Sequence, residues 1–226
     1  VEPTKYYLCL EPDLEKFTFK GGEEIELEIK KPVSKITLHS VGPKIKEVSI
    51  RQGDADYARA KKISFNEKME TMTFDFGRTL KKGPANLFIN FEGELNDKLH
   101  GFYRTSYKID GVKKVGAATQ FEAIDARRAF PCFDEPDKKA KFNITLVVPK
   151  ELTALSNMAV KSEYLRAWAS WASSKKLVQF EETPKMSTYL AAWVVADLDY
   201  LEAYDKNGVR IRFYTTPDKK DFGKFA

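Results

Sequence analysis

The most constraining feature of this sequence is a strict two-residue alternation of apolar and charged side chains over residues 24–30, which read EIELEIK. Successive side chains of a β-strand point to opposite faces, so Ile25, Leu27 and Ile29 would share one face. The same period recurs in three later runs, which are Leu87, Ile89 and Phe91; Phe142, Ile144, Leu146 and Val148; and Val209, Ile211 and Phe213. Half-buried antiparallel strands are therefore predicted along much of the chain.

Dipeptides that contain glycine separate these runs and predict turns at Gly21-Gly22, Asp110-Gly111 and Asn207-Gly208. The last two favour the primed turns that match strand twist, so hairpins are expected at about residues 103–120 and 198–214. Few windows show a helical period, and no linker or internal repeat interrupts the pattern. The sequence predicts an all-β fold, a saddle-like antiparallel β-sandwich, as a single domain over residues 1–226.

Composition narrows the class of protein. Hydrophobic residues make up 42% of the 226 residues, enough for a sizeable core, and the formal net charge is +5. Basic residues are scattered in pairs instead of forming a patch, so no nucleic-acid partner is expected. No apolar run approaches the length of a membrane helix, and the N-terminus lacks the regions of a signal peptide. With two cysteines far apart in sequence, a cytoplasmic location is expected.

Residue chemistry gives no self-contained catalytic centre. The two histidines, His39 and His100, do not stand in a metal-ligand spacing, and nucleotide-binding and hydrolase motifs are absent. The alternation of His39 with Ile36 and Leu38 places it on the polar face of a strand. No catalytic or metal-ligating residue is therefore expected in this chain.

Two stretches break the strand pattern. Residues 119–136, TQFEAIDARRAFPCFDEP, combine charges, aromatics and two prolines without a period, as functional loops often do. Residues 163–176, EYLRAWASWASSKK, place Trp168 and Trp171 three positions apart, a spacing that suits one face of a short helical turn.

The first stretch carries a family resemblance. The runs GFYRTSY (101–107), TQFEAIDARRAFPCFDEPDKKAKFNITLVVPKELTALSNM (119–158) and TPKMSTYLAAWVV (183–195) closely resemble the N-terminal domain of zinc-dependent gluzincin aminopeptidases, in particular the cytosolic puromycin-sensitive branch. The resemblance covers essentially the whole chain. In that family a catalytic domain follows, with a GAMEN motif and an H-E-x-x-H zinc helix, and both motifs are absent here. The resemblance implies a non-catalytic domain whose zinc lies in the missing catalytic domain.

The resemblance also assigns substrate-binding residues. In the family the Q-x-E segment projects into the active site, and its carboxylate binds the free N-terminus of the peptide. By position this carboxylate is Glu122, and Gln120 lines the pocket for the first substrate side chain. A carboxylate fixed beside the scissile bond can pair with the α-ammonium and set the distance to the carbonyl. On the residues alone, a solvated acid at a strand end is the favoured interpretation of Glu122, and the motif match reverses this in favour of substrate binding.

The remaining residues of the stretch are interpreted as structural. Five charged residues are expected to pair among themselves and hold the loop in shape, namely Asp125, Arg127, Arg128, Asp134 and Glu135. Cys132 is expected to be a buried thiol, since neither histidine is near it in sequence. Phe102 and Tyr103 are expected to be core or loop-anchoring aromatics.

The sequence departs from the family pattern at Ile124, where Thr is usual, at Ala159, where Pro is usual, and in the run RAWASWASS. Two tryptophans in a loop indicate either a contact surface for a protein partner or packing onto a neighbouring sheet. Three hypotheses follow: the substrate-gating domain of an aminopeptidase, a natural or engineered scaffold that presents Trp168 and Trp171, or a free-standing β-domain with no peptidase partner.

Overall fold

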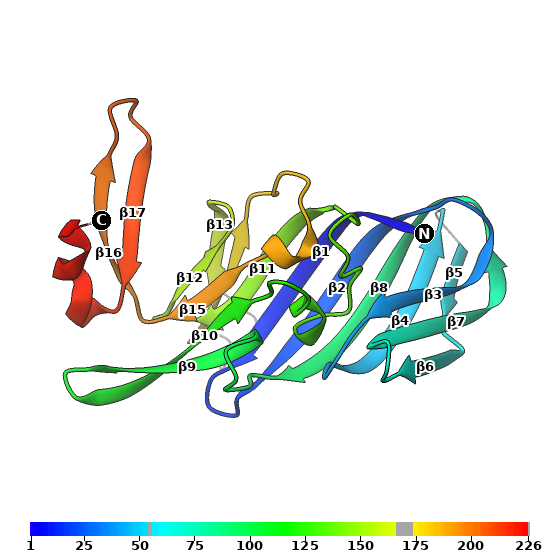
Figure 1. The fold of residues 1–226 in the computed structure, drawn as a ribbon, viewed down its shortest axis with the longest axis horizontal. Coiled ribbons are helices and arrows are strands. Elements are labelled where there is room, and N and C mark those ends of the chain that lie inside the picture. The colour runs from blue at the N-terminus through cyan, green and yellow to red at the C-terminus, as the bar shows by residue number, and fades with distance from the viewer. Residues whose placement is uncertain (54–55, 166–173, 226) are drawn as a thin grey trace.

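The computed structural model describes residues 1–53, 56–165 and 174–225 (Figure 1). Strands account for 63% of the structure and helices for 7%, which confirms the predicted all-β class. The strands, in chain order, are β1 (Glu2–Asp13), β2 (Thr18–Ile29), β3 (Val33–His39), β4 (Lys44–Gln52), β5 (Asp56–Arg59), β6 (Lys62–Asn66), β7 (Thr71–Leu80), β8 (Gly83–Glu94), β9 (Gly101–Ile109), β10 (Val112–Gln120), β11 (Lys141–Pro149), β12 (Thr153–Ser156), β13 (Val160–Leu165), β14 (Lys175–Phe180), β15 (Trp193–Ala196), β16 (Asp199–Tyr204) and β17 (Arg210–Thr215). The 3-10 segments within the described residues are η1 (Ala126–Arg128), η3 (Thr188–Leu190) and η4 (Pro217–Phe225).

The strands form four sheets. The largest has eight strands in the order β13-β14-β11-β1-β2-β8-β4-β5, and the others are β12-β15-β10-β9, β3-β7-β6 and the hairpin β16-β17. The sequence predicted antiparallel strands, but β1 and β11 pair in parallel, with Tyr6 beside Phe142. Both predicted hairpins are confirmed, as β9-β10 and β16-β17. No helix among the described residues is long and apolar enough to cross a membrane.

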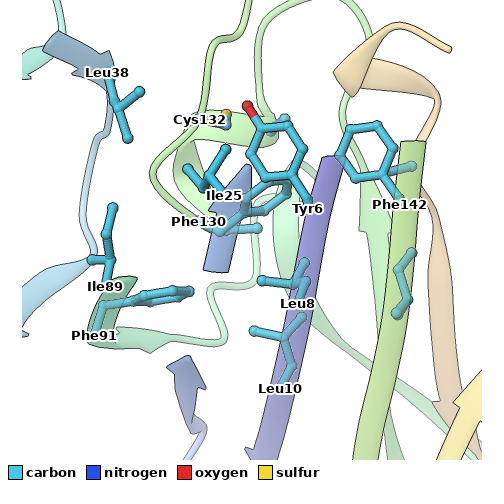
Figure 2. Packing of buried hydrophobic residues seen from close by; sticks show 14 of the residues in the cluster. Tyr6, Leu8, Leu10, Ile25, Leu38, Ile89, Phe91, Phe130, Cys132 and Phe142 are labelled. Carbon is cyan, nitrogen blue, oxygen red and sulfur yellow. The ribbon is translucent and has the colours of Figure 1, made fainter. Parts of the chain in front are cut away.

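The core lies between the large sheet and the three- and four-stranded sheets. Figure 2 shows the Tyr6 ring between Phe130 and Phe142, with its hydroxyl pointing towards Cys132. The rings of Tyr6 and Phe142 are stacked, with centroids 4.8 Å apart, and Phe130 meets Tyr6 edge-on at 6.1 Å. Phe74 of the three-stranded sheet and Trp193 of the four-stranded sheet belong to the same buried cluster. A single core therefore holds these sheets together.

The prediction of a turn at Gly21-Gly22 is wrong, since both glycines lie inside β2. In the register of β2 and β8, Gly21 lies opposite Phe91, and Phe19 lies opposite Gly93. A Cβ atom on Gly21 would come within 2.2 Å of the Phe91 ring, and one on Gly93 within 2.2 Å of the Phe19 ring. Each glycine thus makes room for an aromatic ring on the inner face, which is a packing role rather than a turn.

The alternation predicted for residues 24–30 is confirmed, with Ile25, Leu27 and Ile29 buried on the inner face. The same face also carries Glu23, which is only 5% exposed. Neither carboxyl oxygen of Glu23 has a hydrogen-bond partner among the described residues, and burial raises the pKa of this carboxyl well above its ordinary value. Glu23 is therefore an acid in the apolar core, where it is expected to be protonated.

Candidate functional site

The Q-x-E segment begins where β10 ends. Phe121 is buried and meets two aromatic rings edge-on, Trp193 at 5.2 Å and Phe130 at 6.1 Å between centroids. Its two neighbours, Gln120 and Glu122, are both exposed. The buried ring fixes the backbone at this point, so the side chains on either side of it lie on the outer surface.

A tight turn follows the segment. The amide of Asp125 donates a 2.9 Å hydrogen bond to the carbonyl of Phe121, and Arg128 Nε donates to Asp125 Oδ1 at 2.6 Å. A cis peptide bond joins Glu122 to Ala123. Among the described residues the Glu122 carboxylate has no hydrogen bond or ion pair, so it is available to a cation from outside.

Arg127 is the centre of the predicted charge network. Its Nε donates to Asp134 Oδ2 at 2.9 Å, and its Nη1 donates to Glu70 Oε2 at the same distance. The side chains of Arg127 and Asp134 are only 8% and 2% exposed. Burial alone would lower the pKa of the guanidinium, but the hydrogen bonds and charges of Asp134 and Glu70 raise it. The ion pair of Arg127 with Asp134 thus joins the two halves of the loop.

The predicted ion pairs are confirmed for four of the five residues, and the network includes one further residue that was not predicted. Glu70, in the turn between β6 and β7, bridges both arginines but lies far from them in sequence. Glu135 was predicted to take part and does not, because it is exposed and forms no ion pair with the described residues. Water can solvate an exposed carboxylate, so it needs no protein partner.

The second half of the loop is fixed to the two sheets beneath it. Cys132 and His39 exchange backbone hydrogen bonds of 2.8 and 3.0 Å, and the Phe133 amide donates to Tyr6 Oη at 3.1 Å. The Asp134 amide donates to His39 Nδ1 at 3.3 Å. Side chains from β1 and β3 thus determine where the loop lies.

His39 does not lie on an open polar face as predicted. It is half-buried, because the loop covers the end of β3. The pKa of its imidazole is lowered mainly by burial and also by the positive charge of Arg127. Cys132 is a buried free thiol as predicted, and burial raises its pKa well above the ordinary value. A thiol of this kind is not a nucleophile, although His39 is its neighbour in space.

The other candidates are the aromatics Phe102 and Tyr103 and the tryptophans Trp168 and Trp171. Phe102 is fully buried against Phe19 and Trp193, as predicted, and Tyr103 is half-buried in β9. Trp168 and Trp171 lie outside the described residues, so the predicted contact surface and helical turn there stay predictions. Within residues 1–53, 56–165 and 174–225, no group of three or more His, Cys, Asp or Glu side chains could hold a metal ion. The described residues therefore do not fit a zinc ion.

Known proteins resemble the chain along its full length. The chain is 43% identical to aminopeptidase 2 of Candida albicans and 42% identical to the puromycin-sensitive aminopeptidase of Caenorhabditis elegans, and each match covers 100% of the chain. It is 44% identical to mitochondrial aminopeptidase 2 of Saccharomyces cerevisiae. The chain spans only 23% of the length of each of these relatives.

A family model described as the peptidase M1 N-terminal domain matches residues 2–190. The matched region holds both sheets that carry the loop, the Q-x-E segment itself and the Arg127 network. The chain therefore belongs to the peptidase M1 family, of which it represents the N-terminal domain.

Proposed function

We propose that this chain is the non-catalytic N-terminal domain of a zinc aminopeptidase, and that its Q-x-E segment faces the active site and binds the free N-terminus of the peptide substrate. The observation that carries the proposal is the state of Glu122. Its carboxylate is exposed and has no partner among the described residues, while Phe121 beside it is buried in an aromatic cluster. The buried Phe121 ring holds the backbone of the segment in place and leaves the Glu122 side chain exposed.

A fixed carboxylate suits an aminopeptidase for a chemical reason. A free N-terminus differs from an internal peptide bond by its α-ammonium, and a carboxylate can pair with that cation. The pair fixes the first residue of the peptide and thereby the position of the scissile carbonyl. Gln120, exposed on the same segment, would contribute an amide to the wall of the pocket for the first side chain.

The rest of the enzyme must supply the chemistry. About three quarters of each relative's length lies beyond the region matched by this chain. The zinc ion, which would polarise the scissile carbonyl and activate water, belongs to that remainder in this proposal. We expect the isolated chain to hydrolyse no aminoacyl amide and to bind no stoichiometric zinc. Metal analysis that found one tight zinc per purified chain would contradict this expectation.

The hairpin β16-β17 with η4 is the surface where we expect the catalytic domain to dock. It stands away from the other sheets in Figure 1, and η4 packs closely on it, since a Cβ on Gly223 would lie 2.5 Å from Phe213. Its exposed apolar side chains include Tyr204 at 63% and Phe222 at 72%. A surface of this kind indicates a missing protein partner.

The experiment that tests the proposal uses the full-length enzyme encoded by the reading frame that contains this chain. Glu122→Ala removes one desolvated charge pair, so kcat/KM on unblocked aminoacyl substrates should fall by about 2–4 kcal/mol, roughly 30- to 1,000-fold. Glu122→Gln should recover little, because it keeps the shape but not the charge. Glu135→Ala is the matched control, an exposed acid of the same loop without an ion pair among the described residues.

Two outcomes would count against the proposal. If Glu122→Ala kept the kcat/KM of the unmodified enzyme, Glu122 would not bind the substrate ammonium. If Glu135→Ala lost as much activity as Glu122→Ala, the effect would reflect the general charge of the loop. A reading frame without a zinc motif after residue 226 would remove the catalytic domain from the proposal and favour a free-standing β-domain.

A further inference from the structure

β6 is an uncovered edge of the sandwich. It is the last strand of the sheet β3-β7-β6, and all five of its residues are exposed. Figure 1 shows it at the outer border of the molecule, beyond β7. Ile63 is 43% and Phe65 50% exposed, although Phe74 and Met72, opposite them on β7, are buried. The apolar face of this sheet therefore continues past the part that the core covers.

The space beside the strand is open. A groove of about 440 Å³ beside Ile63 is lined by Lys46, Glu47 and Val48 of β4, by Arg59 at the end of β5, and by Ala60. An edge strand with free backbone groups and apolar side chains is a template for another strand. Such an edge normally carries protection against pairing, and the feature on β6 that needs explanation is its pair of large apolar side chains.

The sequence of β6 is complementary to itself in the antiparallel direction. When two copies pair about a two-fold axis at Ser64, Ile63 of each copy lies opposite Phe65 of the other, so the dimer holds two such apolar pairs. Lys62 then lies opposite Asn66, so no charges of like sign meet within the strand. Directly beyond the strand, Lys61 and Glu67 come opposite each other with complementary charges.

Neighbouring registers lack this agreement. A pairing centred on Phe65 sets Lys62 opposite Lys68 and Ile63 opposite Glu67. A pairing centred on Ile63 sets Lys61 opposite Phe65. Because cross-strand pairs of like charge are destabilising, the register about Ser64 is favoured.

We propose that β6 is a homodimer contact, through which two copies of this chain join their three-stranded sheets into one continuous antiparallel sheet about a two-fold axis at Ser64. The contact is isologous, with the same surface in both copies. It involves one short strand from each copy, so the association should be weak, with a dissociation constant roughly in the micromolar to millimolar range. The proposal is independent of the role assigned to Glu122.

Sedimentation measurements over a range of chain concentrations test the proposal. We expect a reversible monomer–dimer equilibrium. Phe65→Lys should raise the dissociation constant on the order of tenfold or more, because it removes two apolar cross-strand pairs per dimer. Val112→Lys is the matched control, since Val112 is 59% exposed at the tip of the β9-β10 hairpin. Circular dichroism of each variant checks that the fold is retained.

Cysteine cross-linking tests the register in a Cys9→Ser background. The Cα atoms of paired residues on antiparallel strands lie about 4.5–5.5 Å apart, within disulfide reach, so Ser64→Cys should give a disulfide-linked dimer on oxidation. Asn66→Cys is the control, because the two introduced cysteines would be about 13 Å apart along the strands.

Three results would overturn the proposal. The first is a chain that stays monomeric at millimolar concentration. The second is a dimer that Phe65→Lys leaves unchanged, which would place the contact elsewhere, for example on the exposed edge strand β13. The third is cross-linking of Ser64→Cys that is no faster than that of Asn66→Cys.

Discussion

Two regions of this domain use similar residues in opposite ways. The loop at residues 119–136 buries its aromatics and its main ion pair, and leaves only a few side chains such as Glu122 exposed. The β16-β17 hairpin with η4 exposes its aromatics, and its Arg212–Glu202 ion pair of 2.7 Å is about 30% exposed on each side. The loop is complete within this chain, whereas the hairpin has an apolar surface without a partner among the described residues.

The difference shows which region has its conformation determined inside the domain. Contacts from β1, β3 and the β6-β7 turn fix the loop, so its exposed residues are presented in a defined geometry. Contacts within the hairpin are local, such as the stacking of Arg212 on Tyr200 at 4.5 Å.

The first prediction compares the two ion pairs. Arg127→Ala should lower the free energy of unfolding by about 3–5 kcal/mol, because Asp134 would remain buried without its cation. Arg212→Ala should change the denaturation midpoint little, since its partner Glu202 is solvated. Chemical denaturation of both variants measures the difference. An equal loss of unfolding free energy in the two variants would contradict the proposed difference between the loop and the hairpin.

The second prediction concerns Glu23, the buried acid on the inner face of β2. The folded state raises its pKa above the ordinary value of 4.5, so the folded chain binds the proton more tightly than the unfolded chain. Stability should therefore be full below about pH 4.5 and fall as the pH rises from there towards the folded-state pKa. Glu23→Leu should raise the free energy of unfolding on the order of 1–3 kcal/mol at neutral pH. It should also remove the fall of this free energy with rising pH that Glu23 causes.

Denaturation curves at several pH values measure this effect. Glu24→Leu is the matched control, because Glu24 lies on the other face of β2 and accepts a 2.7 Å hydrogen bond from Asn86. The interpretation of Glu23 would be contradicted if its replacement by Leu destabilised the chain at neutral pH.

The third prediction concerns the exposed hairpin. Ile211→Ser and Phe222→Ser should change the free energy of unfolding of the isolated chain by no more than about 0.5 kcal/mol, since both side chains are more than half exposed. The same changes should weaken binding to a separately produced catalytic domain, which a titration would measure. A large loss of stability in the isolated chain would show that the hairpin is part of its core.

Local chemistry made part of this fold predictable from the sequence. The β9-β10 hairpin turns at Asp110-Gly111, where both residues have positive φ, at 49° and 79°, as a primed turn requires. The alternation over residues 24–30 predicted a buried face because a strand with one covered face has that period. These signals depend only on neighbouring residues.

The features that could not be predicted depend on contacts between residues far apart in sequence. The Gly21-Gly22 pair resembles a turn until Phe91 is placed over it, and His39 resembles a surface residue until the loop covers it. Glu70 gave no signal as a partner of Arg127. The family resemblance supplied the roles of Gln120 and Glu122, which stay proposals, while the structure supplies the buried Phe121 between them.

The parallel pairing of β1 with β11 has a consequence for how the domain is made. β1 lies in the middle of the eight-stranded sheet, between β2 and a strand that follows ten others in the chain. The N-terminal strand therefore cannot complete its pairing during synthesis until β11 has left the ribosome. Such long-range closure slows folding, and the nascent half-sheet offers the β1 edge to other strands during that interval. A shortened chain that starts after Asp13 would divide the sheet at its centre, so the first residues of this domain are a condition for its assembly.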